Sequence, residues 1–175
     1  ATDWPTSFQA LLAQGSAIAA GILAETNVCT LPPGGDDCQA FIDPARVTTE
    51  KCVYIAGGQR MLKVDKVDNR PINEATLNRF KDSLADCAAD AVVFSDFRHG
   101  IFNRNSIPQF TASLKPGPLR VADSQVASRW GNILDFQGFD LITPNEREAR
   151  FALAEQDSGI RPLCLELYRQ TKCTH

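Results

Sequence analysis

Three short apolar runs in the second half of the chain organise its pattern of hydrophobic and polar positions. They are Ala91 to Phe94, Leu119 to Ala122, and Asp140 to Ile142. Each run is too short for a helix, and the segments between them have room for one. This arrangement is typical of buried parallel strands joined by helical crossovers. The pattern therefore predicts an α/β fold with a mostly parallel sheet.

Polar residues close all three runs. They are Ser95 and Asp96, then Asp123 and Ser124, then Thr143 and Asn145. In open parallel sheets, ligands bind outside the carboxyl ends of the strands. The sequence therefore predicts a binding site at one edge of one sheet.

Amphipathic stretches around these strands predict the helices. The expected segments are 6–25, 74–87, 106–115, 125–138, a helix capped by Asn145, and 160–171. In the last helix, we expect Leu163, Cys164, Leu167 and Tyr168 to be buried. A further strand is expected at 28–31 and a turn at 32–37.

Residues 48–66 show a different pattern, in which Thr, Val, Tyr and Ile alternate with polar residues on both sides of Gly57 and Gly58. This pattern predicts an antiparallel hairpin. A hairpin that precedes parallel crossovers is not expected inside the main sheet, so we interpret it as a lid or an edge. Its charged residues Arg60, Lys63 and Asp65 either contact a ligand or form a solvated strand face, and both interpretations stay open.

Composition narrows the class of protein. The chain has 175 residues, of which 43% are hydrophobic, and this is enough for one substantial core. A net charge of -3 without a basic block argues against nucleic-acid or anionic-membrane partners and favours small solutes. No apolar run approaches the roughly 18 residues of a membrane span, and residues 1–15 lack the basic start of a signal peptide. We therefore expect one cytoplasmic domain.

The cysteines and histidines favour reduced thiols, with disulfides or a metal site as the alternatives. The six cysteines form no CxxC pair, and there are only two histidines. We interpret the cysteines as buried, reduced thiols, because free cysteine packs as a small hydrophobe. No GxSxG nucleophile signature is present.

The pair Asn145 and Glu148, three positions apart at a helix start, has two interpretations. In one, the pair forms a capping box, with Glu148 bonding back to the backbone of the cap residue. In the other, both side chains are directed at hydrated magnesium or phosphate, a hypothesis that Asp96 and Asp123 at neighbouring strand ends strengthen.

Several stretches together resemble the ribokinase (PfkB) carbohydrate kinases, and most of all the bacterial heptose-phosphate kinase branch. They are residues 59–65, 93–97 with Gly100, 121–124, and 141–148, which contains Thr143, Pro144, Asn145 and Glu148. The resemblance covers about 48–175, and the first helix more weakly.

The resemblance implies a three-layer α/β/α sandwich with a small β lid at 48–66 that closes over a sugar, and magnesium-ATP as the phosphoryl donor. It implies that Asn145 and Glu148 act near magnesium and phosphate. We assign Asp123 and Ser124 to the nucleotide with them. Asp96, Arg60, Lys63 and Gly15 are assigned to the sugar side; the small residues around Gly15 are equally consistent with tight helix packing. Pairing of lids would make a homodimer.

The catalytic aspartate of that family lies in a glycine motif of GAGD type, which this sequence does not contain. We therefore assign no catalytic residue. The chain is interpreted as an incomplete copy of an ATP-dependent sugar or sugar-phosphate kinase. The alternatives are a non-catalytic sugar- or nucleotide-binding regulatory domain and a purely structural partner domain.

Overall fold

The computed structural model describes residues 20–21, 39–41, 43–47, 49–125 and 133–175. Gly15, the strand expected at 28–31 and the turn at 32–37 lie outside these residues. The helix expected at 6–25 is wrong at Ala20–Gly21, which form strand β1 and pair in parallel with β2, Gln39–Ala40. Gly21 has a low helix propensity, and at Ala20 the pairing with β2 overrides a high one.

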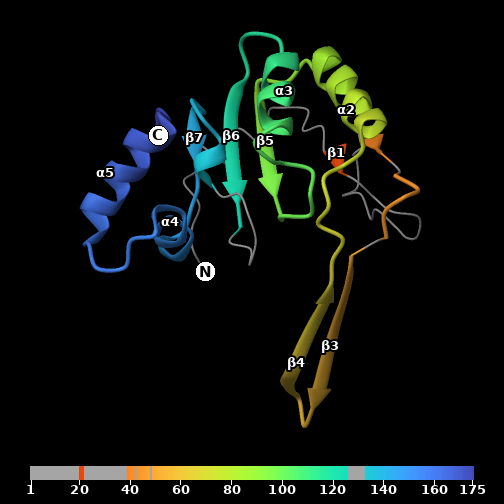
Figure 1. The fold of residues 1–175 in the computed structure, drawn as a ribbon, viewed down its shortest axis with the longest axis vertical. Helices are drawn as coiled ribbons and strands as arrows, with labels where there is room; N and C mark the ends of the chain where they lie inside the picture. The colour runs from red at the N-terminus through yellow and green to blue at the C-terminus, as the bar shows by residue number, and fades with distance from the viewer. Residues whose placement is uncertain (1–19, 22–38, 42, 48, 126–132) are drawn as a thin grey trace.

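The main sheet has three parallel strands in the order β5-β6-β7 (Figure 1). They are β5 (Ala91–Asp96), β6 (Leu119–Ser124) and β7 (Leu141–Ile142). The expected strands are confirmed, but the polar residues that follow the first two apolar runs are the last residues of β5 and β6. Beyond β7, the backbone of His175 donates to Asp140 O at 2.9 Å and accepts from Ile142 N at 3.1 Å. This is the bonding pattern of one further parallel strand position.

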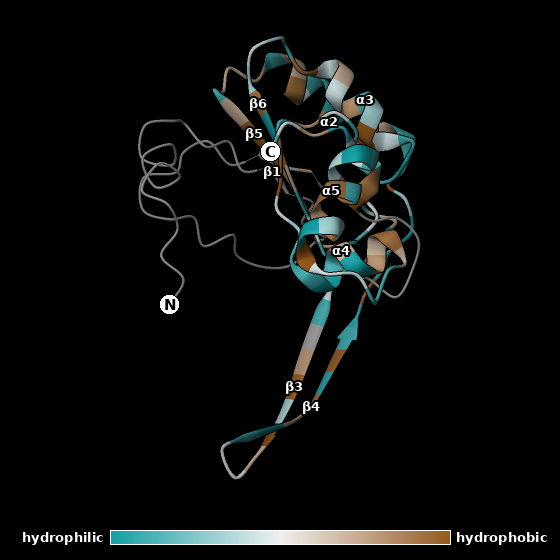
Figure 2. Cartoon of the chain, turned by 90° about the vertical axis from the view of Figure 1, so that its left-hand side faces the viewer, coloured by the Kyte–Doolittle hydropathy of each residue, from teal (hydrophilic) through white to brown (hydrophobic). Residues whose placement is uncertain are grey.

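The helices of the described residues lie on one side of this sheet (Figure 2). They are α2 (Glu74–Asp86), α3 (Ser106–Ser113), the 3-10 turn η1 (Ile133–Asp135), α4 (Glu146–Leu153) and α5 (Ile160–Thr171). On β5 the helix-facing Phe94 is 3% exposed, whereas Val93, on the opposite face, is 50% exposed. Within the described part of the chain, the fold thus has one helical layer on one sheet, and the three-layer sandwich remains a prediction.

Aromatic side chains fill the space between the sheet and the helices. Phe94 lies with its ring centroid 5.0 Å from that of Phe139 and 6.3 Å from that of Phe136, both edge-on. Phe80 of α2 and Phe110 of α3 belong to the same buried cluster. Edge-to-face packing adds to the free energy gained from burying these rings. This core fixes the sheet and therefore the positions of its strand ends.

Helix α5 has the expected bounds but not the expected buried face. Leu163, Leu167 and Thr171 are buried, whereas Cys164 is exposed and Tyr168 is 54% exposed. Residues four apart share a face, and the next residue is turned by about 100° away from it. The expected burial of Cys164 and Tyr168 is therefore wrong.

The cysteines of the described residues are free thiols. They are Cys52, Cys87, Cys164 and Cys173. Only Cys173 among them is buried, so the expectation of buried thiols does not hold for the others. No helix of the described residues has the length and apolar character needed to cross a membrane.

Strands β3 (Glu50–Ala56) and β4 (Gln59–Lys66) form a separate antiparallel sheet, the hairpin, which projects from the body of the molecule (Figure 1). Gly57 and Gly58 connect the strands with φ values of 56° and 75°. Two consecutive positive φ angles are what a two-residue type I′ turn requires, and glycine adopts them at low cost.

Candidate functional site

The ladder between β5 and β6 brings the polar residues of the two strand ends side by side. Ser95 lies opposite Asp123, and Asp96 lies opposite Ser124. Because side chains alternate along a strand, Asp96 and Ser124 share the face covered by helices, and Ser95 and Asp123 share the other. The carboxylates of Asp96 and Asp123 are therefore close along the edge but on opposite faces of the sheet.

Asp96 is almost fully engaged by protein donors. Its Oδ1 accepts a hydrogen bond from the backbone N–H of Arg98 at 2.7 Å, and its Oδ2 accepts from Arg98 Nη1 at 2.5 Å and Ser124 Oγ at 3.1 Å. The side chains of Asp96 and Arg98 are 1% and 7% exposed. Arg98 has a φ of 61°, a left-handed conformation that the Asp96 bonds help to hold. In this arrangement Asp96 organises the edge from inside, and its assignment to a sugar remains a prediction.

Asp123 and Thr143 connect the end of β6 to the turn that follows β7. Thr143 Oγ1 donates to Asp123 Oδ1 at 3.1 Å. Asp123 is half-buried and Ser95 is exposed. The edge therefore offers a carboxylate and two hydroxyls on the face that the described helices do not cover. All three residues, Ser95, Asp123 and Thr143, were noted at the strand ends in the sequence. That they share a face follows only from the register of the strands.

Asn145 and Glu148 form both bonds of a capping box at the start of α4. Glu148 N–H donates to Asn145 Oδ1 at 2.9 Å, and Asn145 N–H donates to Glu148 Oε2 at 2.8 Å. Asn145 is exposed and Glu148 is half-buried. A carboxylate has about four acceptor positions, so one capping bond leaves Glu148 able to accept others. The capping geometry and a role toward a ligand are therefore compatible.

The oxygen ligands at this edge suit a magnesium ion that keeps its bound waters and contacts the protein through them. Within the described residues, no group of three or more His, Cys, Asp or Glu side chains is placed to hold a metal ion. Magnesium keeps several waters and is commonly held by one or two carboxylates together with substrate phosphates. Glu148, with Asn145 beside it, fits that outer role, and a cage built from protein ligands is not formed by these residues.

The capping box carries a stability prediction of its own. Replacing Asn145 with alanine should lower the free energy of unfolding by about 1 kcal/mol, because the N–H of Glu148 loses its acceptor. Urea unfolding followed by far-UV circular dichroism measures the change. An Asn145→Asp variant, which keeps the acceptor, should retain the stability; an equal loss in both variants would contradict the capping role.

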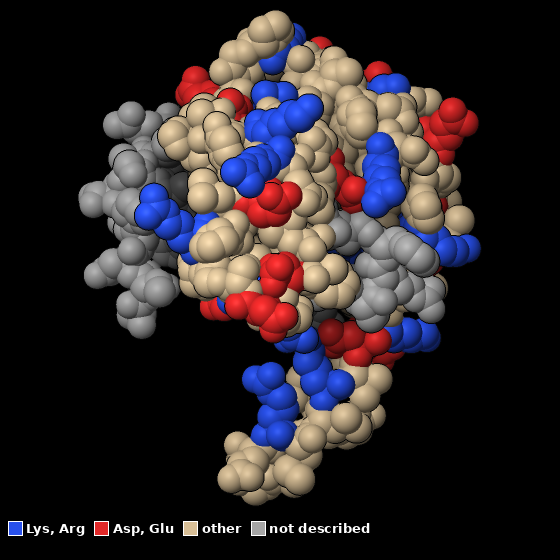
Figure 3. Space-filling view, turned by 60° about the vertical axis from the view of Figure 1, so that its left-hand side comes forward, with Lys and Arg blue, Asp and Glu red and all other residues tan. Residues whose placement is uncertain are grey.

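The hairpin residues assigned to the sugar are solvent-facing. Lys63 Nζ lies 3.0 Å from Asp65 Oδ2, and the side chain of Lys63 is 45% exposed. Arg60 is exposed, and Figure 3 shows lysine and arginine side chains along the hairpin. Exposed ion pairs contribute little to stability. A solvated strand face describes these residues in this structure, and their contact with a ligand remains a prediction.

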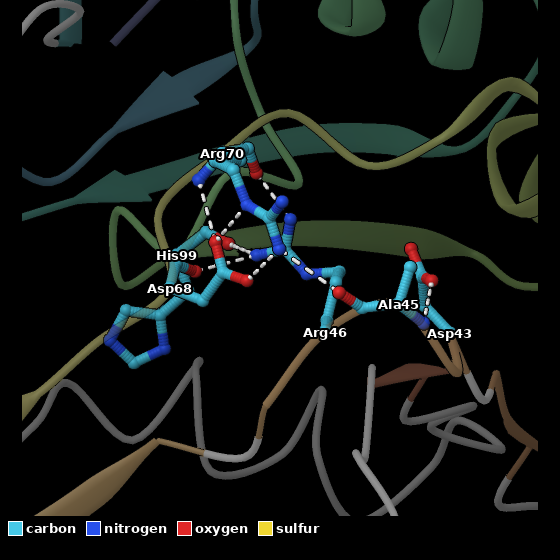
Figure 4. A network of polar contacts seen from close by, with 6 residues as sticks. All are labelled: Asp43, Ala45, Arg46, Asp68, Arg70 and His99. Carbon is cyan, nitrogen blue, oxygen red and sulfur yellow. Dashed lines mark hydrogen bonds and ion pairs between the residues drawn. The ribbon is translucent and has the colours of Figure 1, made fainter.

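The base of the hairpin carries a polar network that sequence reasoning missed (Figure 4). It contains Asp43, Arg46, Asp68 and Arg70, and the backbone carbonyl of His99. Hydrogen bonds from Arg70 hold the pKa of the Asp68 carboxyl well below its ordinary value. Asp68 thus stays charged at neutral and mildly acidic pH. These residues are isolated charges in loops, and nothing in their spacing signals that they meet.

Comparison with known proteins gives several relatives that share one name. The chain is 36% identical over 144 residues to "Bifunctional protein HldE" of Caulobacter vibrioides, a match covering 75% of this chain and 28% of that protein. Proteins of the same name from Pelobacter propionicus and Helicobacter hepaticus are 26% and 25% identical, over 74% and 73% of this chain. The chain spans less than a third of the length of these relatives. No family model matches it.

Proposed function

We propose that this chain is part of a carbohydrate kinase related to the heptose-phosphate kinases, in which a phosphoryl group passes from magnesium-ATP to a hydroxyl of a sugar or sugar phosphate. The similarity to the HldE proteins over three quarters of the chain carries this proposal. The polar edge of the β5-β6-β7 sheet supports it, because ligands of parallel sheets bind at the carboxyl ends of the strands.

The nucleotide side of the proposed site is the edge from Asp123 to the start of α4. Bound magnesium would neutralise charge on the transferred phosphates. Glu148 and Asn145 would hold its water shell, while Asp123 and Thr143, already bonded to each other, would position polar atoms beside the phosphates. Ser124 donates its hydroxyl to Asp96, so we assign it an indirect role that keeps the two strand ends together.

The hairpin is the proposed lid over the sugar. One of its faces carries Tyr54, Leu62 and Val64, which are 58%, 54% and 46% exposed. An isolated two-stranded hairpin is marginal in water, so this apolar face is expected to gain a partner. We propose that it packs against the lid of a second copy, which gives a homodimer. The opposite side, where Arg60 and Lys63 pair with the exposed Ile55 and Val53, then faces the sugar.

The proposed dimer can be tested on the apolar face. A Leu62→Lys variant should sediment as a monomer under conditions in which the parent chain sediments as a dimer, because it places a charge inside the shared surface. Arg60→Lys is the matched control, since it also changes a hairpin residue but keeps its charge. A parent chain that is monomeric at all concentrations would contradict the pairing of lids.

The proposed function predicts stabilisation by its ligands. Thermal unfolding of the chain should shift upward with magnesium-ATP, and further when a sugar phosphate or a sugar is added, because ligands that bind only the folded state stabilise it. Testing sugars and sugar phosphates in parallel identifies the acceptor class. No shift with any nucleotide or sugar would contradict the proposal.

Glu148 separates the two interpretations of the capping box. A Glu148→Gln variant should unfold at nearly the parent temperature, because glutamine can still bond the backbone of Asn145. The extra shift that magnesium gives in the presence of ATP should fall. Glu146→Gln, in the same helical turn and paired with Arg150 at 2.8 Å, is the matched control and should keep that shift. If Glu148→Gln destabilises the chain and leaves the magnesium effect intact, Glu148 serves only the cap.

A further inference from the structure

The base of the hairpin is held by one arginine side chain that reaches three backbone carbonyls. Arg46 donates from Nη2 to Asp68 O at 2.6 Å and to His99 O at 2.5 Å, and from Nη1 to Arg70 O. Asp68 and Arg70 lie on the segment that leaves β4, and His99 lies in the loop after β5 (Figure 4). A single guanidinium therefore joins the hairpin to the main sheet.

A second arginine, Arg70, connects the segment after β4 back to the segment before β3. Arg70 donates to both carboxylate oxygens of Asp68, at 3.0 Å and 2.6 Å, and to Ala45 O at 2.9 Å. Asp43 in turn caps the short turn that presents Arg46, by accepting from Ala45 N–H at 3.0 Å. We call Arg46, Asp68 and Arg70 the clasp.

Beside the clasp, the backbone at Gly100 lies unusually close to the backbone at Arg70. Gly100 has a φ of 86°, and a Cβ built on it would lie 1.9 Å from Arg70 O. Ile72 N–H donates to Gly100 O at 3.1 Å. The segment after β4 is thus held against the loop after β5 by backbone contact as well as by the arginines.

From this geometry we propose that the clasp fixes the direction in which the hairpin projects from the carboxyl edge of β5. The loop that the clasp holds begins directly after Asp96, the last residue of β5. A change in the orientation of the hairpin would therefore shift this loop and the strand end next to it. The planar guanidinium of Arg46 suits this role, because its donors are held in a fixed fork on separate nitrogens that reaches carbonyls of two chain segments, whereas all three donors of a lysine leave one nitrogen. This inference concerns the hairpin itself and holds whether or not a nucleotide or sugar binds.

The two tyrosines of the chain give a direct test. Tyr54 lies on the hairpin and Tyr168 on α5, and they are similarly exposed, at 58% and 54%. Biosynthetic 3-fluorotyrosine therefore places one ¹⁹F reporter on the hairpin and one reference on the body. The parent for this test is the Leu62→Lys chain, in which pairing of lids does not hold the hairpin. When Arg46→Lys is added to it, the transverse relaxation rate of the Tyr54 signal should fall by about twofold or more as the hairpin gains nanosecond motion, while that of Tyr168 stays unchanged.

Two further variants complete the experiment. Asp68→Asn removes the carboxylate that orients Arg70 and should change the Tyr54 signal in the same direction. Arg104→Lys alters an arginine paired with Asp135 at 3.1 Å, away from the hairpin, and should change neither signal. The proposal is overturned if Arg46→Lys leaves the Tyr54 rate at the parent value, or if the Tyr54 and Tyr168 rates fall together, because the clasp would then not act locally on the hairpin.

Discussion

Replacing Gly100 with alanine should lower the free energy of unfolding by about 3 kcal/mol or more. Two costs add up: alanine is strained in the left-handed backbone conformation, and its Cβ overpacks the site. The added Cβ would lie 1.9 Å from Arg70 O and 2.8 Å from the carbonyl carbon of the same residue. Backbone atoms cannot turn aside as a flexible side chain can, so the segment after β4 would have to leave the loop after β5. Urea unfolding measures the loss, and the Tyr54 fluorine signal reports whether the hairpin is released.

The matched control is Gly138→Ala. Gly138 also has a positive φ, of 66°, but a Cβ built on it meets no atom within 4 Å. This variant should cost only the conformational term, about 1 kcal/mol. Equal losses at the two glycines would contradict the close approach at the base of the hairpin.

Replacing Asp96 with alanine should destabilise the chain by about 3–5 kcal/mol, because the buried guanidinium of Arg98 loses the carboxylate with which it forms an ion pair. Equilibrium denaturation in urea measures this change. Ser124→Ala removes only one hydrogen bond to Asp96 and should cost about 1 kcal/mol.

The same pair of variants distinguishes a structural from a ligand-binding Asp96. If Asp96→Ala retains the stability of the parent but loses its thermal shift with sugars, the internal role derived from the ion pair is wrong. A large loss of stability would show that Asp96 has a structural role, which is to hold Arg98 in position.

The parallel strands and α5 could be predicted because their signals are local. Short apolar runs and the four-residue spacing of Leu163 and Leu167 require no knowledge of distant residues. The prediction that Cys164 is buried is wrong because Cys164 is apolar and directly follows Leu163. In the sequence it therefore looks like part of the buried face of α5. Which neighbouring helix face is covered depends on tertiary packing, which periodicity alone does not contain.

The site was less predictable because its arrangement depends on register and on contacts between distant segments. The polar strand ends were recognised, but only the pairing of Ser95 with Asp123 places Asp96 on the opposite face. The left-handed backbone of Arg98 and the reach of Arg46 to His99, 53 positions away, leave no pattern in the sequence. The assignments of Asn145, Glu148 and Asp123 to magnesium-ATP remain predictions that binding experiments must test.

Isothermal titration of the chain with ATP, with and without magnesium, tests the proposed function most directly. The account predicts saturable binding at one site that strengthens with magnesium, and a weaker magnesium effect in Glu148→Gln than in Glu146→Gln. Heats of dilution alone in both titrations, with or without a sugar phosphate present, would contradict a nucleotide site at the edge of this sheet.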